Sequence, residues 1–463
     1  MKLLVVLSKN LQPAKWHAYD RNVTGKGHRE FCNLYNVDNN ERVIQRNNPM
    51  RLWPNLFTKD DIMDENVIYG FNTAIREVWT HQHPLDCSRA KFMISSGWMG
   101  GFASVPHVEG VALAIAMELG RILLPHPDGV VRGAPRDFGF HIDHGWQVDN
   151  EYCRNQNTTS LDCYYESWSS CTIEDALRGR SIKDIPDIWL NELDIIAIRE
   201  SGNTTLPLRI RRRTRRFRVI QYINYFNHFT FIPKMLRPIA DCSPMRNGFQ
   251  YYWWRAISAT YMMRTNARTL AEIEKYSTLT IDWSKETCVA AHVRLGDKGA
   301  EMKLVPLDMY LLAAENLWEQ GIMRRGPEQN VPVLFISSDD PEVYVNATLW
   351  GKLKGWRVVY TSLVDKAKLS SRLDHIALEE AKRSPGGLQH HEFEYFSMIL
   401  NLDYALRCHA WICPLQSNTC RLIDEMRATV GGKAASGIFV DVSYETCAHP
   451  PCYNGEGVVT FGW

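Results

Sequence analysis

The stretch Ala290–Met302, AAHVRLGDKGAEM, decides the fold predicted for this chain of 463 residues. The segment leading into it, Cys288–Val293, is small and apolar, which is typical of a buried strand in a parallel sheet. Open α/β sheets bind ligands just beyond the carboxyl ends of their strands, so the charged turn that follows is a candidate site. A solvated turn with a surface ion pair is the plainer alternative. The charged residues of the turn are Arg294, Asp297, Lys298 and Glu301.

Strands and helices alternate from residue 287 to the end of the chain. Alternating βα units favour a doubly wound parallel sheet, and right-handed crossovers bring its strand ends to one rim. That rim would gather Arg294, residues 337–340 and residues 414–418. The predicted strands are 288–293, 331–337, 356–361, 410–413 and 437–442, and the predicted helices are 306–317, 342–350, 392–407 and 417–429.

The first half of the chain carries a second α/β pattern. A glycine-rich loop at 97–107 precedes a helix predicted over 108–119 and a strand at 122–124, and two helices are expected within 250–276. Residues 137–172 suggest a disulfide-stapled insertion, whereas residues 1–80 are irregular to helical. The sequence therefore predicts two Rossmann-like domains behind an irregular or helical N-terminal region.

Composition narrows the class of protein. Hydrophobic residues make up 45% of the chain and charged residues 23%, while the net charge of +1 gives no global field for nucleic acid or membranes. No segment approaches the ~20 apolar residues that span a bilayer. The start, Met1–Leu7, is interpreted as a strand or a truncated leader. Twelve cysteines without Cys-x-x-Cys pairs or zinc-like spacing favour disulfides and an oxidising compartment.

One strongly basic run, Ile210–Arg218 (IRRRTRRFR), has no partner in the predicted site. A solvated helix face is the first interpretation of such a run, an anionic-ligand site the second, and a furin-like processing site the third. Nucleic-acid binding would call for interleaved aromatic residues and a basic domain, and the sequence has neither.

His292, Val293, Arg294, Asp297 and Lys298 form a pattern, H-V-R-x-x-D-K, that resembles the donor-binding motif of the α1,6-fucosyltransferases and their bacterial nodulation relatives. The usual form in that family is H-V-R-R-T-D-K, so this chain departs from it at Leu295 and Gly296. Three more stretches resemble the family in the same order along the chain. They are His83–Ala90 (HPLDCSRA), Phe335–Pro341 (FISSDDP) and Cys413–Arg421 (CPLQSNTCR).

The resemblance implies roles for residues of this chain. Glu301 would be the base that takes the acceptor proton, with Asp297 as the alternative, and Arg294 and Lys298 would hold the diphosphate. Ser417 would open a helix whose N-terminus favours a phosphate, although Ser is also an ordinary N-cap. The remaining implied residues are His292, Asp339, Asp340, Asn401, Asp403 and Asn418 at the donor site, Gly100, Gly101, Ser104 and His107 in the glycine loop, and a Cys413–Cys420 disulfide.

The chemistry expected of these residues needs no metal. A nucleoside diphosphate gains negative charge as the sugar C1–O bond breaks, and fixed cations with a helix N-terminus can stabilise it. No Asp-x-Asp metal motif occurs in the sequence. Arg294 offers a bidentate fork for phosphate, and one carboxylate base suffices for direct displacement with inversion. Where the family has an Asp that binds guanine, this chain has Asn401.

We therefore expect a GT-B-type α/β fold with a region 1–80, an acceptor-side domain 81–285 and a donor-side domain 286–463. The expected function is metal-independent, inverting transfer of fucose from GDP-fucose to a glycan or protein hydroxyl. The partners would be a nucleotide sugar and a glycan or glycoprotein acceptor, in the Golgi lumen of the secretory pathway. Membrane attachment is expected only through an anchor preceding this sequence. A GT-B enzyme with another nucleotide sugar, or a non-catalytic glycan-binding relative, is the alternative.

Overall fold

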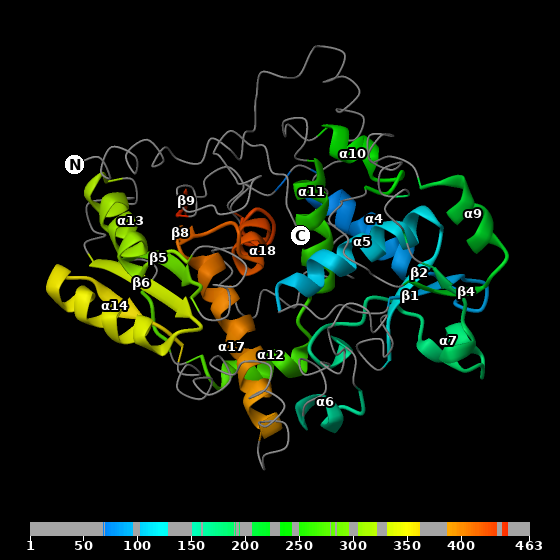
Figure 1. Ribbon diagram of the computed structural model, residues 1–463, viewed down its shortest axis with the longest axis horizontal. Coiled ribbons are helices and arrows are strands. Elements are labelled where there is room, and N and C mark those ends of the chain that lie inside the picture. Colours follow the sequence, from blue (N-terminus) through cyan, green and yellow to red (C-terminus); the bar gives the residue numbers. More distant parts are fainter. Residues whose placement is uncertain are drawn as a thin grey trace. The chain divides into compact units, whose positions relative to one another are not determined.

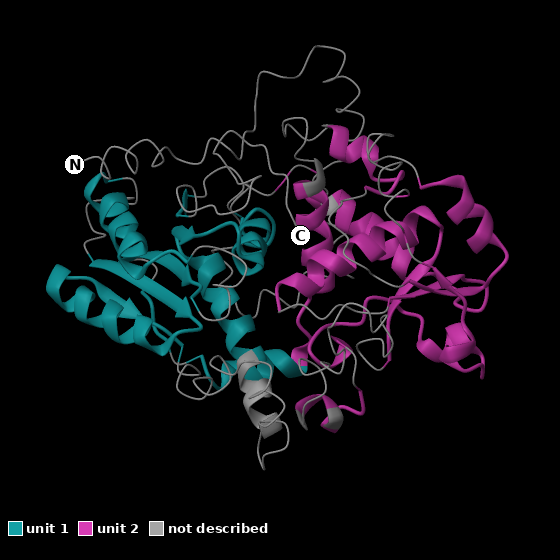
Figure 2. Cartoon of the chain, in the orientation of Figure 1, with its two compact units in different colours: residues 1–19, 54–66, 268–462 teal, residues 20–53, 67–267, 463 magenta. Residues whose placement is uncertain are grey.

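A computed structural model describes most of the chain between residues 68 and 442 (Figure 1). The described ranges are 68, 70–95, 102–127, 151–158, 161–188, 190, 194, 206–222, 232–242, 250–277, 279–282, 285–295, 304–321, 331–361, 387–432 and 438–442. Two compact units divide these residues, one ending at Ala267 and the other beginning at Arg268 (Figure 2). The assignment of acceptor and donor roles to the two halves of the chain stays a prediction.

The unit that begins at Arg268 holds five parallel strands in the order β7-β6-β5-β8-β9. The central strand β5 pairs with β6 over its whole length, from Glu286 opposite Val331 to Val293 opposite Ser338. The elements are α12 (Ala267–Glu274), β5 (Glu286–Val293), α13 (Leu307–Glu319), β6 (Val331–Ser338), α14 (Pro341–Lys354), β7 (Arg357–Val359), α17 (Gly387–Arg407), β8 (Ala410–Cys413), α18 (Asn418–Arg427) and β9 (Ile438–Asp441).

Helices cover both faces of this sheet, and α13 and α14 lie on one side of it with α17 on the other (Figure 1). Val289, Ala291 and Val293 face a core that α13 and α14 complete. The alternate side chains face α17, where Phe335 stacks on Tyr404 with ring centroids 5.2 Å apart. Successive strand residues point to opposite faces, so a strand buried on both must be apolar throughout, as Cys288–Val293 is apart from His292.

The other unit holds four parallel strands in the order β2-β1-β4-β3. Helices α4, α5 and α11 cover one face, and α5 and α11 approach closely at Gly110, where an added Cβ would lie 2.5 Å from Ser258 Oγ. The indole of Trp254 donates to the Gly110 carbonyl at 3.0 Å. The elements are α4 (Phe71–Gln82), β1 (Phe92–Ser95), α5 (Ser104–Glu118), β2 (Ile122–Pro125), α6 (Glu151–Asn155), η5 (Leu161–Cys163), α7 (Ile173–Leu177), η6 (Ile182–Asp184), β3 (Asp187–Ile188), α9 (Leu208–Arg215), β4 (Val219–Tyr222), α10 (Arg237–Cys242) and α11 (Gln250–Met262).

The α/β class and the two parallel sheets are confirmed, and most elements lie within a few residues of their predicted bounds. Helix α5 differs, since it begins at Ser104 rather than near Val108 and takes Pro106 into its first turn. Proline is tolerated there because the first backbone N–H groups of a helix have no intrahelical acceptor. Residues 137–172 also contain the short helices α6 and η5 in their described part. No helix in the described ranges has the length and apolar character to cross a membrane.

Four disulfides are formed among the described cysteines, which confirms the prediction that the cysteines pair. The Cys413–Cys420 pair is the one that the sequence resemblance implied. The sequence left the other pairings open, and they are Cys87–Cys171, Cys153–Cys163 and Cys288–Cys408. Cys447 and Cys452 lie outside the described residues.

Candidate functional site

The carboxyl edge of the five-stranded sheet has a switch point between β5 and β8. From β5 the chain continues to β6 and β7 on one side, and then returns to place β8 and β9 on the other. In open α/β sheets ligands bind outside the strand ends at such a point. The strand ends that meet there carry Arg294 after β5 and the turn 414–417 after β8, as the sequence predicted.

Arg294 and Asp339 pair directly across the ends of β5 and β6. Arg294 Nη1 donates to Asp339 Oδ2, and the backbone N–H of Leu295 donates to Asp339 Oδ1 at 2.9 Å. Side-chain exposure is 25% for Arg294 and 8% for Asp339, so the pair lies at a partly buried rim. Asp339 therefore fixes both the guanidinium and the backbone just beyond the strand.

His292 is buried one residue before the end of β5. Its Nδ1 lies 2.9 Å from Ser337 Oγ, and its Nε2 has no hydrogen-bond partner among the described residues. Burial lowers the pKa of His292 to about 4, with Asp339 opposing and Arg294 reinforcing the shift. The imidazole is thus neutral at pH 7 and places a polar nitrogen beside the Arg294–Asp339 pair.

Ser417 occupies the N-cap position of α18, and its side chain makes no capping hydrogen bond. The preceding turn is held from inside by Arg421, whose guanidinium donates to the carbonyls of Leu415 at 2.8 Å and Gln416 at 2.9 Å. The Cys413–Cys420 disulfide ties the strand to the first turn of the helix. The N-terminus of α18 thus stands in a fixed position at the switch point, with Asn418 as its first residue.

Asp340 opens the neighbouring helix α14. Its carboxylate accepts from the Glu342 N–H at 2.9 Å, which makes it the N-cap, and Pro341 follows at the first helical position. Tyr344 turns back to the strand end, where its hydroxyl donates to the Ser338 carbonyl at 2.7 Å and accepts from the Ser338 N–H at 2.8 Å. The described contacts of Asp340 are therefore those of a helix cap.

Asn401 and Asp403 lie on α17 and point to different partners. Thr361 Oγ1 donates to Asn401 Oδ1 at 3.1 Å, so Asn401 faces the segment after β7. Asp403 is 1% exposed and pairs with Arg407 one turn along the helix at 3.2 Å. Of the two, Asn401 lies at the carboxyl end of a strand, whereas Asp403 is bound within its own helix.

Two further side chains at this edge were not identified from the sequence. The Tyr310 ring, on α13, is fully buried near the Arg294 backbone, and burial raises the pKa of its hydroxyl. Asp441 ends β9, and its carboxylate accepts from the Leu415 N–H at 3.3 Å. In the sequence, Tyr310 belongs to an apolar helix pattern and Asp441 is a single Asp at the end of a strand. Neither pattern indicates that these two side chains lie at the edge of the sheet where the candidate site is.

Asp297, Lys298 and Glu301, together with Gly100 and Gly101, fall outside the described residues. The described residues contain no group of three His, Cys, Asp or Glu side chains that could hold a metal ion.

The other two residues of the predicted glycine loop, Ser104 and His107, lie in the first turns of α5. Beside them Glu109 is 1% exposed, and its Oε2 has no hydrogen-bond partner among the described residues. Burial raises the pKa of Glu109 to about 7, and the neighbouring Ser95 hydroxyl opposes that shift. The folded chain thus prefers the neutral carboxyl at this position.

This preference predicts a loss of stability with rising pH. The folded state holds the Glu109 proton more tightly than the unfolded state. The contribution of Glu109 to the free energy of unfolding is therefore full below pH 4.5 and is lost as pH rises towards 7. The shift from 4.5 to about 7 corresponds to roughly 3 kcal/mol in the free energy of unfolding. Measured by urea unfolding from pH 5 to 8, the wild type should lose about this much stability relative to Glu109→Gln, because the pH effects of all other groups are common to the two proteins. Parallel pH profiles of the two proteins would contradict the prediction.

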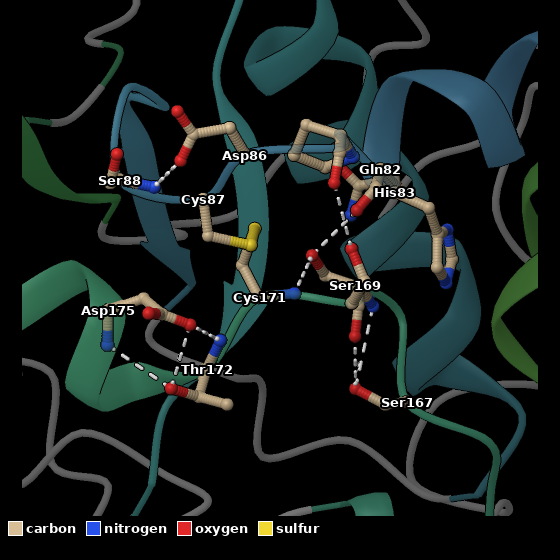
Figure 3. The surroundings of a disulfide bond; sticks show 12 residues. Gln82, His83, Asp86, Cys87, Ser88, Ser167, Ser169, Cys171, Thr172 and Asp175 are labelled. Carbon is tan, nitrogen blue, oxygen red and sulfur yellow. Dashed lines mark hydrogen bonds between the residues drawn. A yellow bond between two sulfur atoms is a disulfide. The ribbon is translucent and has the colours of Figure 1, made fainter.

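A cavity of about 770 Å³ opens beside the carboxyl end of β2, in the same unit. The Cys87–Cys171 disulfide and a hydrogen-bonded run hold one wall, where Ser169 Oγ donates to the Gln82 carbonyl at 2.6 Å (Figure 3). Among the described residues that line the cavity, the charged side chains are the carboxylates of Asp162 and Glu174. The lining comprises Leu124, Pro125, Pro127, Asn157, Thr158, Asp162, Ser167, Ser169, Cys171, Thr172, Ile173 and Glu174.

No protein-family model and no curated protein match the sequence. Among solved structures, the chain is similar to fucosyltransferases. The fucosyltransferase NodZ from Bradyrhizobium is 12% identical with a TM-score of 0.38, over 73% of this chain and 93% of NodZ. Arabidopsis thaliana FUT1 in complex with GDP is 8% identical with a TM-score of 0.40, over 82% and 76%. POFUT1 in complex with GDP-fucose is 9% identical with a TM-score of 0.38, over 76% and 97%. At these identities and scores, the function must be argued from the residues of the site.

Proposed function

We propose that the chain is a fucosyltransferase that moves fucose from GDP-fucose to a hydroxyl of a glycan or a protein, with inversion and without a metal. One observation carries the proposal. Arg294, His292 and the N-terminus of α18 converge at the switch point of a parallel sheet, and they belong to two ordered stretches that resemble the fucosyltransferase donor motifs.

The proposed donor site binds the diphosphate with fixed charge. A guanidinium carries five donors in a planar fork, so Arg294 can bind a phosphate while Asp339 holds its position. The α18 N-terminus adds backbone N–H groups and the positive end of the helix dipole. Both stabilise the additional negative charge that the diphosphate gains as the C1–O bond breaks, and this preference for the transition state accelerates transfer.

The proposed reaction is a single displacement. An acceptor hydroxyl attacks C1 of fucose as the bond from C1 to the diphosphate oxygen breaks, and the bonding electrons leave with GDP. Glu301 accepts the hydroxyl proton, with Asp297 as the alternative base, and Lys298 adds a cation near the diphosphate. These three assignments rest on the sequence resemblance.

The unit that contains β1 is proposed to receive the acceptor. The described residues that line the cavity beside β2 present hydroxyl, amide and carboxylate groups and no cation, which suits a neutral, hydroxyl-rich ligand better than a second phosphate. We propose that residues 81–285 form the acceptor side and residues 286–463 the donor side of a GT-B enzyme. The four disulfides fit an oxidising lumen, and we place the enzyme in the Golgi.

Titration of the purified chain with GDP, UDP and CDP in EDTA tests the donor site. We expect GDP to bind without metal and more tightly than the other two nucleotides, followed by transfer from GDP-fucose to a glycan acceptor. Preference for UDP or CDP, or a need for a divalent metal, would overturn the assignment of the donor.

Two alternatives can be tested, and the first has a specific observation behind it. Asn401 stands where the family has a guanine-binding Asp, and it bonds to Thr361, which favours a GT-B enzyme with a different nucleotide sugar. A non-catalytic glycan-binding relative would bind GDP without turnover, and its properties would not change in Glu301→Gln.

A further inference from the structure

The unit that contains β1 carries a cluster of cations at the amino edge of its sheet, all of them exposed except Arg218, which is half-buried. Lys91 directly precedes β1 and Arg218 directly precedes β4, and the other members come from α9 and from the turn after α7. Parallel strands begin at one edge and end at the other, so this cluster lies opposite the carboxyl edge where α/β units bind ligands. We call it the basic surface, and it comprises Lys91, Arg178, Arg180, Arg213, Arg215 and Arg218.

Two guanidiniums of the basic surface converge on one carbonyl oxygen. Arg178 Nη2 and Arg218 Nη1 each donate to the Ser88 carbonyl at 2.6 Å. Burial lowers the pKa of Arg218 and the like charges of Arg178 and Arg180 lower it further, while the nearby carboxylates of Asp175 and Asp86 oppose the shift. Repulsion between cations held this close is relieved when an anion binds between them.

Helix α9 is held rigidly, so its arginines stay in place. Ile210 and Thr214 are buried beneath it, and Arg211 pairs with Glu118. Lys91 Nζ donates to the Arg215 carbonyl at 2.8 Å at the end of the helix. Protease recognition requires an extended segment, so the helix disfavours the furin-like interpretation of the Arg run.

The basic surface also holds carboxylates, but fewer than its cations. The carboxylate of Asp187 interacts electrostatically with Arg213, and those of Asp175 and Asp86 interact with Arg218. Hydrogen bonds from Ser88, followed by the charges of two nearby arginines, lower the pKa of Asp86. The six cations thus outnumber the neighbouring carboxylates. The basic surface carries a net positive charge, with negative charges interspersed among its cations.

The chemistry of the surface points to one class of partner. Guanidinium forks bind sulfate and carboxylate groups bidentately. The aromatic rings that bases would need for stacking are covered, since Arg218 lies over Phe92 at 5.2 Å and Arg216 over Phe217 at 4.8 Å. Separated cations match the spaced charges of a chain better than the continuous charge of a lipid surface. We propose that the basic surface binds an acidic polysaccharide, independently of the donor site.

Heparin chromatography with a salt gradient tests this proposal on the full chain. We expect retention above about 0.15 M salt. Binding should weaken as salt rises, because each bound Lys or Arg releases counterions that were condensed on the polyanion. The triple variant Arg180→Gln, Arg213→Gln, Arg215→Gln should bind heparin roughly tenfold to a hundredfold more weakly at that salt. A matched control, Arg268→Gln, Lys285→Gln, Lys352→Gln, removes the same charge from exposed positions of the other unit and should elute as the wild type.

The outcomes separate the proposal from its rivals. Equal elution of the two triple variants would overturn it, because the effect would then follow net charge alone. Stronger binding to phosphatidylserine vesicles or to duplex DNA than to heparin at equal salt would also overturn it, in favour of a membrane or nucleic acid. The vesicle comparison is needed because Leu208, at the start of α9, is an apolar side chain that is 67% exposed. GDP titration of each variant reports on the donor site separately, so failure of one proposal leaves the other intact.

Discussion

Arg294→Ala is expected to abolish fucosyl transfer and to weaken GDP binding about a hundredfold. The proposed fork to the diphosphate contributes two charge-assisted hydrogen bonds, and their loss amounts to about 3 kcal/mol. The same substitution leaves Asp339 at a site where it is 8% exposed, with the Leu295 N–H as its remaining described donor. Stability should therefore fall by about 1–3 kcal/mol, which calls for a control that separates binding from folding.

The double variant Arg294→Met, Asp339→Asn provides that control. It removes both charges of the pair and keeps similar volumes, so no unpaired buried charge remains. We expect urea unfolding close to that of the wild type, with GDP binding still lost. Arg294→Lys should retain part of the binding, because an ammonium group supplies the charge but not the fork. Near-normal GDP affinity in the double variant would show that Arg294 does not bind the donor.

The fold of the unit that begins at Arg268 could be predicted because its signals are local in the sequence. Cys288–Val293 is apolar over its whole length, which identifies a strand buried on both faces, and β5 is that strand. Ser417 precedes an apolar helix pattern, and α18 begins directly after it. The Cys413–Cys420 disulfide was implied by the resemblance of Cys413–Arg421 to the fucosyltransferase motif, in which the two cysteines lie on either side of the turn before the helix.

The contacts that could not be predicted join residues far apart in the sequence. Nothing in the sequence indicates that Tyr310 on α13 packs near the end of β5, or that Asp441 on β9 binds the turn after β8. The pairing of Cys288 with Cys408 spans 120 residues, and twelve cysteines allow many combinations. The glycines of 97–107 predicted a loop up to His107, whereas α5 begins at Ser104 and includes Pro106 in its first turn.

The Arg run shows how one charged motif divides into structural and exposed parts. Arg211 pairs with Glu118, and Arg218 binds the carbonyls of Cys87, Ser88 and Asp175. Arg212 and its neighbours towards the helix end remain exposed. Spacing alone could not separate these groups, because the separation depends on which face of α9 meets the sheet.

Arg121 is the side chain that holds the end of α9 to that sheet. It is 1% exposed, and its guanidinium donates to four carbonyls: Phe92 at 3.0 Å, Arg218 at 3.1 Å, Thr214 at 2.5 Å and Phe217 at 2.8 Å. Burial lowers the pKa of Arg121 to about 10, so it remains charged at pH 7. One cation thus joins the start of β1, the start of β4 and the last turn of the helix.

Arg121→Met should lower the free energy of unfolding by about 3 kcal/mol or more. Hydrogen bonds to a charged donor are worth about 1.5–3 kcal/mol each, and part of that sum is offset by the desolvation that burying the cation costs. Urea unfolding followed by tryptophan fluorescence measures the loss. The stability of Arg121→Lys should lie between those of Arg121→Met and the wild type, because an ammonium group cannot span all four carbonyls.

GDP affinity should not change in Arg121→Met, since Arg121 belongs to the other unit. Heparin retention should fall, because a frayed α9 no longer holds Arg213 and Arg215 in place. A loss below about 1 kcal/mol would mean that the packing of Ile210 and Thr214, rather than the four carbonyls, anchors the helix.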